Sequence, residues 1–223
     1  MMIKREWTEN AKSLLTPERA TSPSDGRDAI ELVFASNISI NDKVLALDKI
    51  YACNLKLRED KYREMCNFLS GFVQNIKMVK DPKEADSIVE NIAWREFGDG
   101  RSRFVFSSKF CYFTHGKDDG LFFIYDQFVD RALNFLIAGD AVRKYEKNYS
   151  DFANKMRELL FEAENERIPY RDMDGYLWLT GQVLSKDKTR SYPSRKHNYY
   201  PSRVDYFDET RGKENIREML GLM

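Results

Sequence analysis

A lysine in an otherwise apolar stretch is the first residue whose surroundings suggest chemistry. Residues 102–114 read SRFVFSSKFCYFT, and on a helix Lys109 falls inside an arc of aromatic and aliphatic side chains. The opposite side of that helix consists of small residues: Ser107, Ser108, Cys111 and Thr114. We therefore expect burial on both sides. Desolvation favours the neutral amine, the form that attacks an electrophile, whereas a lysine whose stem reaches the surface has only a structural role.

A carboxylate follows at Asp126, immediately before the helical pattern QFVDRALNFL. An aspartate at this place is most simply the N-cap of the helix, where its side chain accepts a hydrogen bond from a backbone amide. A cap also fixes the position of the carboxylate, so this structural role is compatible with catalysis. One turn further, Asp130 and Arg131 are expected to form a helical ion pair or a solvated face.

The helical pattern around these residues extends over most of the chain. Apolar residues recur at helical spacing in these segments: 41–55, 61–73, 81–98, 102–114, 125–140, 150–164 and 171–184. Asn41 or Asp42 is the expected N-cap of the first segment, and the third is expected to begin near Pro82 and end at Gly98. Runs such as ELVF and LFFIY do not alternate as half-buried strands would. We predict an all-α domain of about seven or eight helices over residues 28–185.

Composition narrows the class of protein. The 223 residues include 36 basic and 36 acidic ones, and 42% are hydrophobic, which suffices for a sizeable core. No uncharged run approaches the roughly 20 residues of a membrane span, and the start MMIKREWTEN lacks the apolar stretch of a signal peptide. Three isolated cysteines and two histidines argue against a disulfide framework, a zinc ribbon, an iron–sulfur cluster and a His-rich metal site. We expect a reduced, cytoplasmic protein that contacts no membrane and uses neither cofactor nor metal.

The two ends of the chain differ from its middle. Residues 1–27 read as a polar N-terminal segment, and residues 186–223 as a basic, aromatic tail with a short terminal helix. Between 186 and 203 there are six basic residues and one acidic one. The cations Arg190, Arg195, Lys196 and Arg203 alternate with tyrosines. This pattern is typical of single-strand binding, and equally of an irregular strap that packs its tyrosines on the helical body. The terminal helix is expected to dock back or to bind a protein partner.

The order of SSKF, a loop with glycines and acids, and IYDQFVDRAL resembles the helix-hairpin-helix DNA glycosylase superfamily, and its 8-oxoguanine glycosylase branch in particular. In that family a catalytic lysine lies on the helix after the hairpin, and a catalytic aspartate begins the next helix. Lys109 and Asp126 stand at those two positions. The wider stretch 40–185 is also similar to a group of uncharacterised bacterial proteins placed in that branch, and the tail lies outside the resemblance.

The resemblance implies a DNA base-excision glycosylase with AP-lyase activity, which acts in DNA repair. Lys109 would attack the sugar of a nucleotide rotated out of the duplex, and Asp126 would assist its deprotonation and stabilise the positive charge that develops. The implied phosphate ligands are Arg95, Arg101, Arg103 and Lys117. The implied base-stacking residues are Phe106, Phe113 and Phe123. A solvated loop and core packing, respectively, are the alternatives for these two sets.

Two other functions stay open. The segment before Lys109 reads GDGRSRFVFS, without the proline of the family's hairpin, which motivates a non-catalytic nucleic-acid-binding or protein-interaction module on the same fold. The third hypothesis is a metal-dependent nuclease. Its ligands would be four carboxylates: Asp118, Asp119, Asp126 and Asp130.

Overall fold

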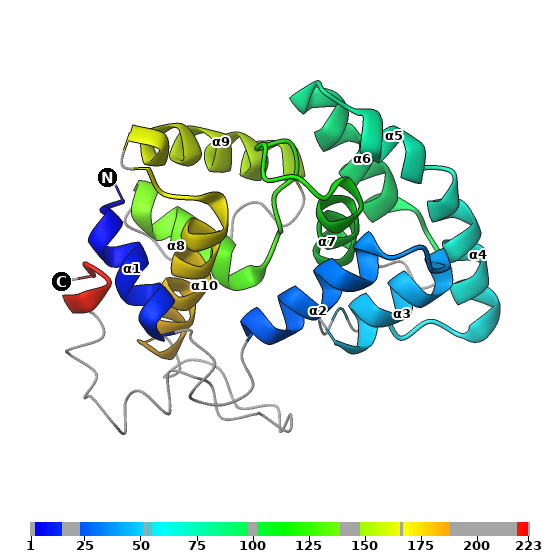
Figure 1. Cartoon of the computed structure of the whole chain (residues 1–223), viewed down its shortest axis with the longest axis horizontal. Helices are drawn as coiled ribbons and strands as arrows, with labels where there is room; N and C mark the ends of the chain where they lie inside the picture. Colours follow the sequence, from blue (N-terminus) through cyan, green and yellow to red (C-terminus); the bar gives the residue numbers. More distant parts are fainter. Residues whose placement is uncertain are drawn as a thin grey trace. The chain divides into compact units, whose positions relative to one another are not determined.

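The computed structural model describes residues 3–14, 23–50, 53, 55–97, 102–138, 148–165, 167–187 and 218–222. Within these ranges the chain forms helices and no strand (Figure 1). The helices are α1 (Arg5–Leu14), α2 (Pro23–Ala35), α3 (Ile40–Lys49), α4 (Glu59–Ser70), α5 (Val73–Met78), α6 (Pro82–Trp94), α7 (Phe104–His115), α8 (Gln127–Ala138), α9 (Tyr149–Asn165) and α10 (Tyr170–Asp187). The prediction of an all-α chain is confirmed for this part of the protein. None of these helices is both long and apolar enough to cross a membrane.

The helices belong to two compact units. Unit 2 contains α2 to α7 and the first half of α9, and unit 1 contains α1, α8, α10 and the second half of α9. The division falls between Tyr125 and Asp126 and again between Arg157 and Glu158. Lys109 is therefore a residue of unit 2, and Asp126 is the first residue of its part of unit 1.

Helix α7 is the central helix of unit 2. It packs against α2, α3, α5 and α6. Ten of its twelve residues are buried, and they include both the aromatic side chains and the small ones. The predicted burial of this helix on both sides is confirmed, because helices pack against it from several directions.

Two predicted helix ends are wrong, for reasons of local hydrogen bonding. Helix α3 has Ser39 as its N-cap, and Asp42 lies inside the first turn, where its amide donates to Ser39 Oγ. Helix α6 begins with the predicted Pro82 but ends at Trp94, not at Gly98, which lies outside the described residues. The chain turns away at Arg95 and returns at Arg103, whose amide donates to the Ala93 carbonyl at 2.9 Å. That bond satisfies a carbonyl that a longer helix would have used.

Unit 1 is built on α10, against which α8 and α1 pack. Helix α1 lies in the segment predicted as polar and N-terminal, and it buries Ala11 and Leu14. The C-terminal residues 218–222 dock onto the same helices. Asn10 Nδ2 donates to the Met219 carbonyl at 2.9 Å, and the Tyr176 hydroxyl donates to the Leu220 carbonyl at 3.0 Å. Residues 188–217, which include most of the predicted basic strap, lie outside the described residues.

A glycine allows α8 and α10 to approach closely. A Cβ atom placed on Gly181 would lie 1.9 Å from the Phe128 carbonyl oxygen and 2.7 Å from the Phe128 Cα atom. Both obstacles are backbone atoms, so no side chain can move aside. The first turn of α8, which begins directly after Asp126, is thus fixed against α10 at this point.

We expect Gly181→Ala to lower the free energy of unfolding by about 2–3 kcal/mol, because the two helices must separate to admit the methyl group. The measurement is urea denaturation followed by circular dichroism. Gly71→Ala is the matched control, since the nearest atom to a Cβ there is at 3.4 Å. Equal stability of the two variants would show that α8 and α10 do not meet at Gly181.

Candidate functional site

Lys109 lies in the middle of α7 with 5% of its surface exposed. Phe106 and Phe113, three positions before it and four after it, are buried on the same side of the helix. The burial expected for Lys109 on this helix is therefore confirmed.

Asp126 is the N-cap of α8, as predicted. Its Oδ1 accepts a hydrogen bond from the Phe128 amide at 2.8 Å, and its carbonyl accepts from the Asp130 amide at 2.9 Å. The positive end of the helix dipole favours a negative charge at this position. The carboxylate is half-buried and held by the helix that it begins.

Asp130 and Arg131 depart from the predicted solvated face. Asp130 is fully buried, and its Oδ1 accepts from Asn134 Nδ2 at 3.0 Å. Arg131 is half-buried and donates to the Ser185 hydroxyl on α10. The expectation of a solvated face is wrong, because this face of α8 is an internal face of unit 1.

The segment 116–125, which joins α7 to Asp126, is buried over its second half without being a helix or a strand. Gly116 ends α7 in the left-handed region, with φ at 69°. Residues 121–125 are then all buried. Tyr149 supplies both partners of the Phe123 backbone: its hydroxyl accepts from the amide at 2.9 Å and donates to the carbonyl at 2.8 Å. Side chains here replace the hydrogen bonds that regular structure would provide.

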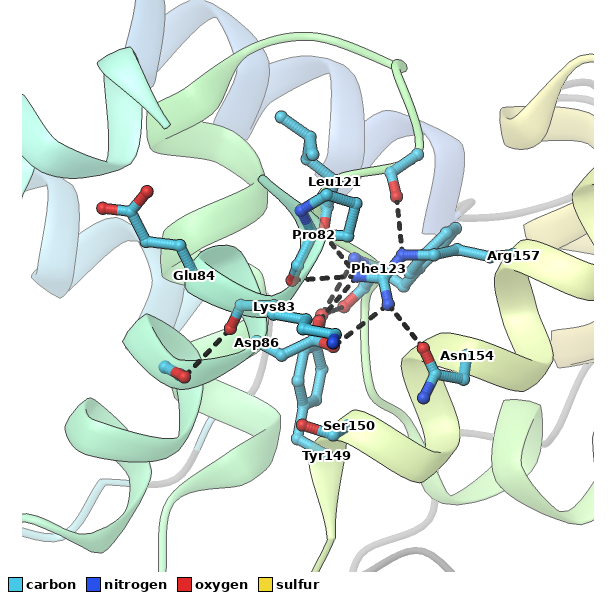
Figure 2. Close-up of polar contacts among 12 residues, drawn as sticks. Pro82, Lys83, Glu84, Asp86, Leu121, Phe123, Tyr149, Ser150, Asn154 and Arg157 are labelled. Atoms are coloured by element: carbon cyan, nitrogen blue, oxygen red, sulfur yellow. Dashed lines mark hydrogen bonds and ion pairs between the residues drawn. The ribbon is translucent and has the colours of Figure 1, made fainter. Parts of the chain in front are cut away.

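An arginine of α9 holds the middle of the same segment (Figure 2). Arg157 Nε donates to the Gly120 carbonyl and Nη2 to the Leu121 carbonyl, both at 3.3 Å. Its guanidinium group lies over the Phe123 ring, 5.6 Å from the ring centroid. The arginine thus contacts three residues of the segment at once.

Asp86 of α6 completes this cluster by a two-point ion pair. Arg157 Nη2 lies 2.6 Å from Oδ1 of Asp86, and Arg157 Nη1 lies 3.0 Å from Oδ2. The Asp86 side chain is 4% exposed and that of Arg157 20%. Burial raises the pKa of Asp86, while the hydrogen bonds and the charge of Arg157 act in the opposite direction. Neither residue was predicted from the sequence, because each stands among other charged residues of its helix and the contact joins distant positions.

The first half of the segment is attached to α7 through its two aspartates. His115 Nε2 lies 2.8 Å from Oδ2 of Asp119, and its Nδ1 lies 3.0 Å from the Ile76 carbonyl oxygen. The Tyr112 hydroxyl donates to Asp118. No group of three His, Cys, Asp or Glu side chains that could hold a metal ion occurs among the described residues.

The residues implied as phosphate ligands have different settings. Arg95 is exposed and its guanidinium group lies over the Phe68 ring. Its Nη2 atom is 3.8 Å from Oε1 of Glu64. Lys117 is exposed. Arg103 is buried, lies over the Phe97 ring and donates to the Arg95 carbonyl. The other cations lie outside the described residues: Arg101, Arg190, Arg195, Lys196 and Arg203.

The three phenylalanines implied as base-stacking residues are core side chains. Phe106, Phe113 and Phe123 are 2%, 4% and 0% exposed. Phe106 stacks on Phe110, and Phe113 packs against Phe34. The alternative prediction, core packing, describes them, because α7 and the segment after it lie inside unit 2.

We expect Arg157→Leu to cost about 3–5 kcal/mol of stability at neutral pH, because it leaves the Asp86 carboxylate buried without its partner. The loss should shrink at acid pH. Without Arg157 the folded-state pKa of Asp86 rises further above its unfolded value, so the destabilisation appears as pH rises above the unfolded pKa. Urea denaturation between pH 3 and pH 7 measures this dependence.

Arg63→Leu is the matched control, since Arg63 pairs with Glu59 on the exposed face of α4 and its loss should leave stability almost unchanged. A pH-independent effect of Arg157→Leu would mean that Asp86 does not depend on Arg157 for its charge.

We compared the chain with protein-family models, curated proteins and solved structures, and nothing matches. The resemblance to DNA glycosylases therefore stays a prediction. What the chain does has to follow from the chemistry of its own residues, above all the buried amine of Lys109 and the capping carboxylate of Asp126.

Proposed function

We propose that this chain is a DNA base-excision glycosylase with AP-lyase activity, and that Lys109 is its nucleophile. The observation that carries the proposal is the burial of Lys109 in α7, with 5% of its surface exposed. Packing in α7 fixes the lysine side chain before substrate binds, which lowers the cost of positioning a nucleophile. The position of Asp126 at the start of the next helix supports the proposal, as does the resemblance in sequence.

The reaction requires one amine and one carboxylate. The Lys109 amine bonds to C1′ of the sugar while the bond from C1′ to the base breaks, and the base leaves with the electron pair and takes up a proton. The added nitrogen then loses a proton, and O4′ takes up a proton as the bond from C1′ to O4′ breaks, which opens the sugar ring and gives a protonated Schiff base. Loss of the C2′ proton breaks the bond from C3′ to oxygen and nicks the strand. Asp126 accepts the proton from Lys109 and stabilises the positive charge on the sugar.

We expect the protein to form a covalent adduct with a duplex that contains 8-oxoguanine, uracil or an abasic site when borohydride is present, because borohydride reduces the Schiff base to a stable amine. Lys109→Gln should form no adduct, and Asp126→Asn should form it about 10²- to 10⁴-fold more slowly. Denaturing electrophoresis of labelled duplex measures the adduct.

Lys80→Gln is the control for the lysine substitution, because Lys80 is an exposed lysine of the same unit. The proposal fails if the wild-type protein traps none of the three duplexes. It fails equally if Lys109→Gln traps as much as Lys80→Gln.

A second candidate function is nucleic-acid binding without catalysis, and the burial of Arg103 and of the three phenylalanines favours it. These side chains belong to the core and not to a DNA surface, so such a module would bind nucleic acid through its exposed cations. In such a module Lys109 is a structural lysine. Binding would depend on salt, since each phosphate contact releases a counterion.

We expect Arg95→Gln to weaken binding to duplex DNA and to reduce the slope of log K against log salt concentration by about 1, because Arg95 is exposed. Arg103→Gln should leave that slope unchanged and lower the melting temperature, because Arg103 is buried. Fluorescence anisotropy at several salt concentrations measures the slope, and calorimetry measures the melting. A change of slope with Arg103→Gln alone would reverse the assignment of the two arginines.

A further inference from the structure

A short segment, residues 218–222, is bound on the face of unit 1 that α1 and α10 form. Asn10 of α1 donates to the Met219 carbonyl, and Tyr176 of α10 donates to the Leu220 carbonyl. All of these residues belong to unit 1. The paired residues are 209 and 44 positions apart in the chain, so the two helices hold the segment through space and not through sequence continuity.

The contact also selects a glycine. The Gly221 amide donates to the Glu218 carbonyl at 2.9 Å, and the φ of Gly221 is 68°, in the left-handed region. A Cβ atom on Gly221 would lie 2.3 Å from Cε2 of Trp7. The Trp7 ring is held in place, because it stacks on the buried ring of Tyr176 with 6.5 Å between centroids. A side chain at position 221 is therefore disfavoured twice, by the backbone and by the ring.

Leucine side chains on both sides of the glycine complete the contact. Leu220 and Leu222 are buried, Met219 and Gly221 are partly exposed, and Glu218 is exposed. The segment is thus held by two leucines, a glycine and two backbone carbonyls. Opening so few contacts costs much less free energy than unfolding the unit that they cover. The segment can therefore be displaced while α1 and α10 stay packed.

We infer that Trp7, Asn10 and Tyr176 form a peptide-binding site, and that its partner is a turn of another protein with the sequence leucine–glycine–leucine. These side chains stand on folded helices and meet backbone carbonyls and apolar groups, which the same sequence on another chain offers equally. Residues 218–222 are then a resident competitor. They lower the apparent affinity for the partner in proportion to the fraction of molecules in which the site is free. The inference does not depend on the proposed function.

The experiment measures binding of a fluorescently labelled peptide of residues 214–223 to the whole chain by anisotropy. Gly221→Val in the chain should raise the affinity for this peptide about 10-fold, because the resident segment no longer occupies the site. Gly221→Val in the peptide should lower its affinity about 10- to 100-fold, because the valine meets the Trp7 ring. Glu218→Gln, at the exposed position of the segment, is the matched control in chain and peptide and should change neither affinity.

Hydrogen exchange on the wild-type chain gives a second test that does not need the variant chain to fold. An excess of unlabelled wild-type peptide should speed exchange of the Gly221 amide of the chain, since displacement opens its bond to the Glu218 carbonyl. The Gly221→Val peptide should not have this effect.

Equal binding of the two peptides by the wild-type chain, or unchanged exchange at Gly221, overturns the inference. A folded Gly221→Val chain that binds the peptide no more tightly than the wild type overturns it equally. A wild-type dimer that Gly221→Val abolishes would show that the site takes the segment of a second copy, and would refute the assignment of another protein as the partner.

Discussion

A buried stretch of chain with no helix or strand to satisfy it is the constraint on which unit 2 depends. Residues 121–125 are buried, and their backbone groups need partners that water cannot supply. The partners come from side chains of two helices: Arg157 and Tyr149 of α9 and Ser108 of α7. Asp86 of α6 in turn holds Arg157. Helices α7 and α9 must therefore lie where their side chains meet one short segment. The hydrogen bonds of that segment thus constrain the helix packing in addition to the apolar contacts.

The choice of arginine at position 157 follows from the same constraint. Two carbonyl oxygens of the segment and a carboxylate converge on one cation, and only a planar group with several donors can meet them together. An ammonium ion of similar charge has no fixed fork and would leave acceptors unmet. Burial of the Asp86 carboxylate costs free energy and raises the pKa of Asp86. Arg157 offsets that cost. The pair is best understood as a way to hold the segment, since burial makes an isolated ion pair a weak source of stability.

Local features of the sequence predicted local features of the structure. The burial of α7 on both sides follows from its aromatic and small faces, and the capping by Asp126 follows from its place before a helical pattern. Contacts between distant positions could not be predicted in this way. Asp86 and Arg157 are 71 positions apart, and each stands among charged neighbours that conceal it. Residue type alone did not predict the setting of Arg103 and Phe123, because an arginine or a phenylalanine suits a DNA surface and a core equally well. Packing decides between the two settings, and both residues are buried.

The proposed chemistry needs an amine and a carboxylate whose positions are fixed before substrate binds, because reorganisation during the reaction would raise the barrier. Lys109 gains its fixed position from a helix that four others enclose. Asp126 is fixed from both sides along the chain. On its C-terminal side, α8 is capped by the Asp126 carboxylate and held close to α10 at Gly181. On its N-terminal side, the Ser108 hydroxyl accepts a hydrogen bond from the Tyr125 amide. Substitutions at Gly181 and Ser108 would therefore disturb the backbone on either side of Asp126.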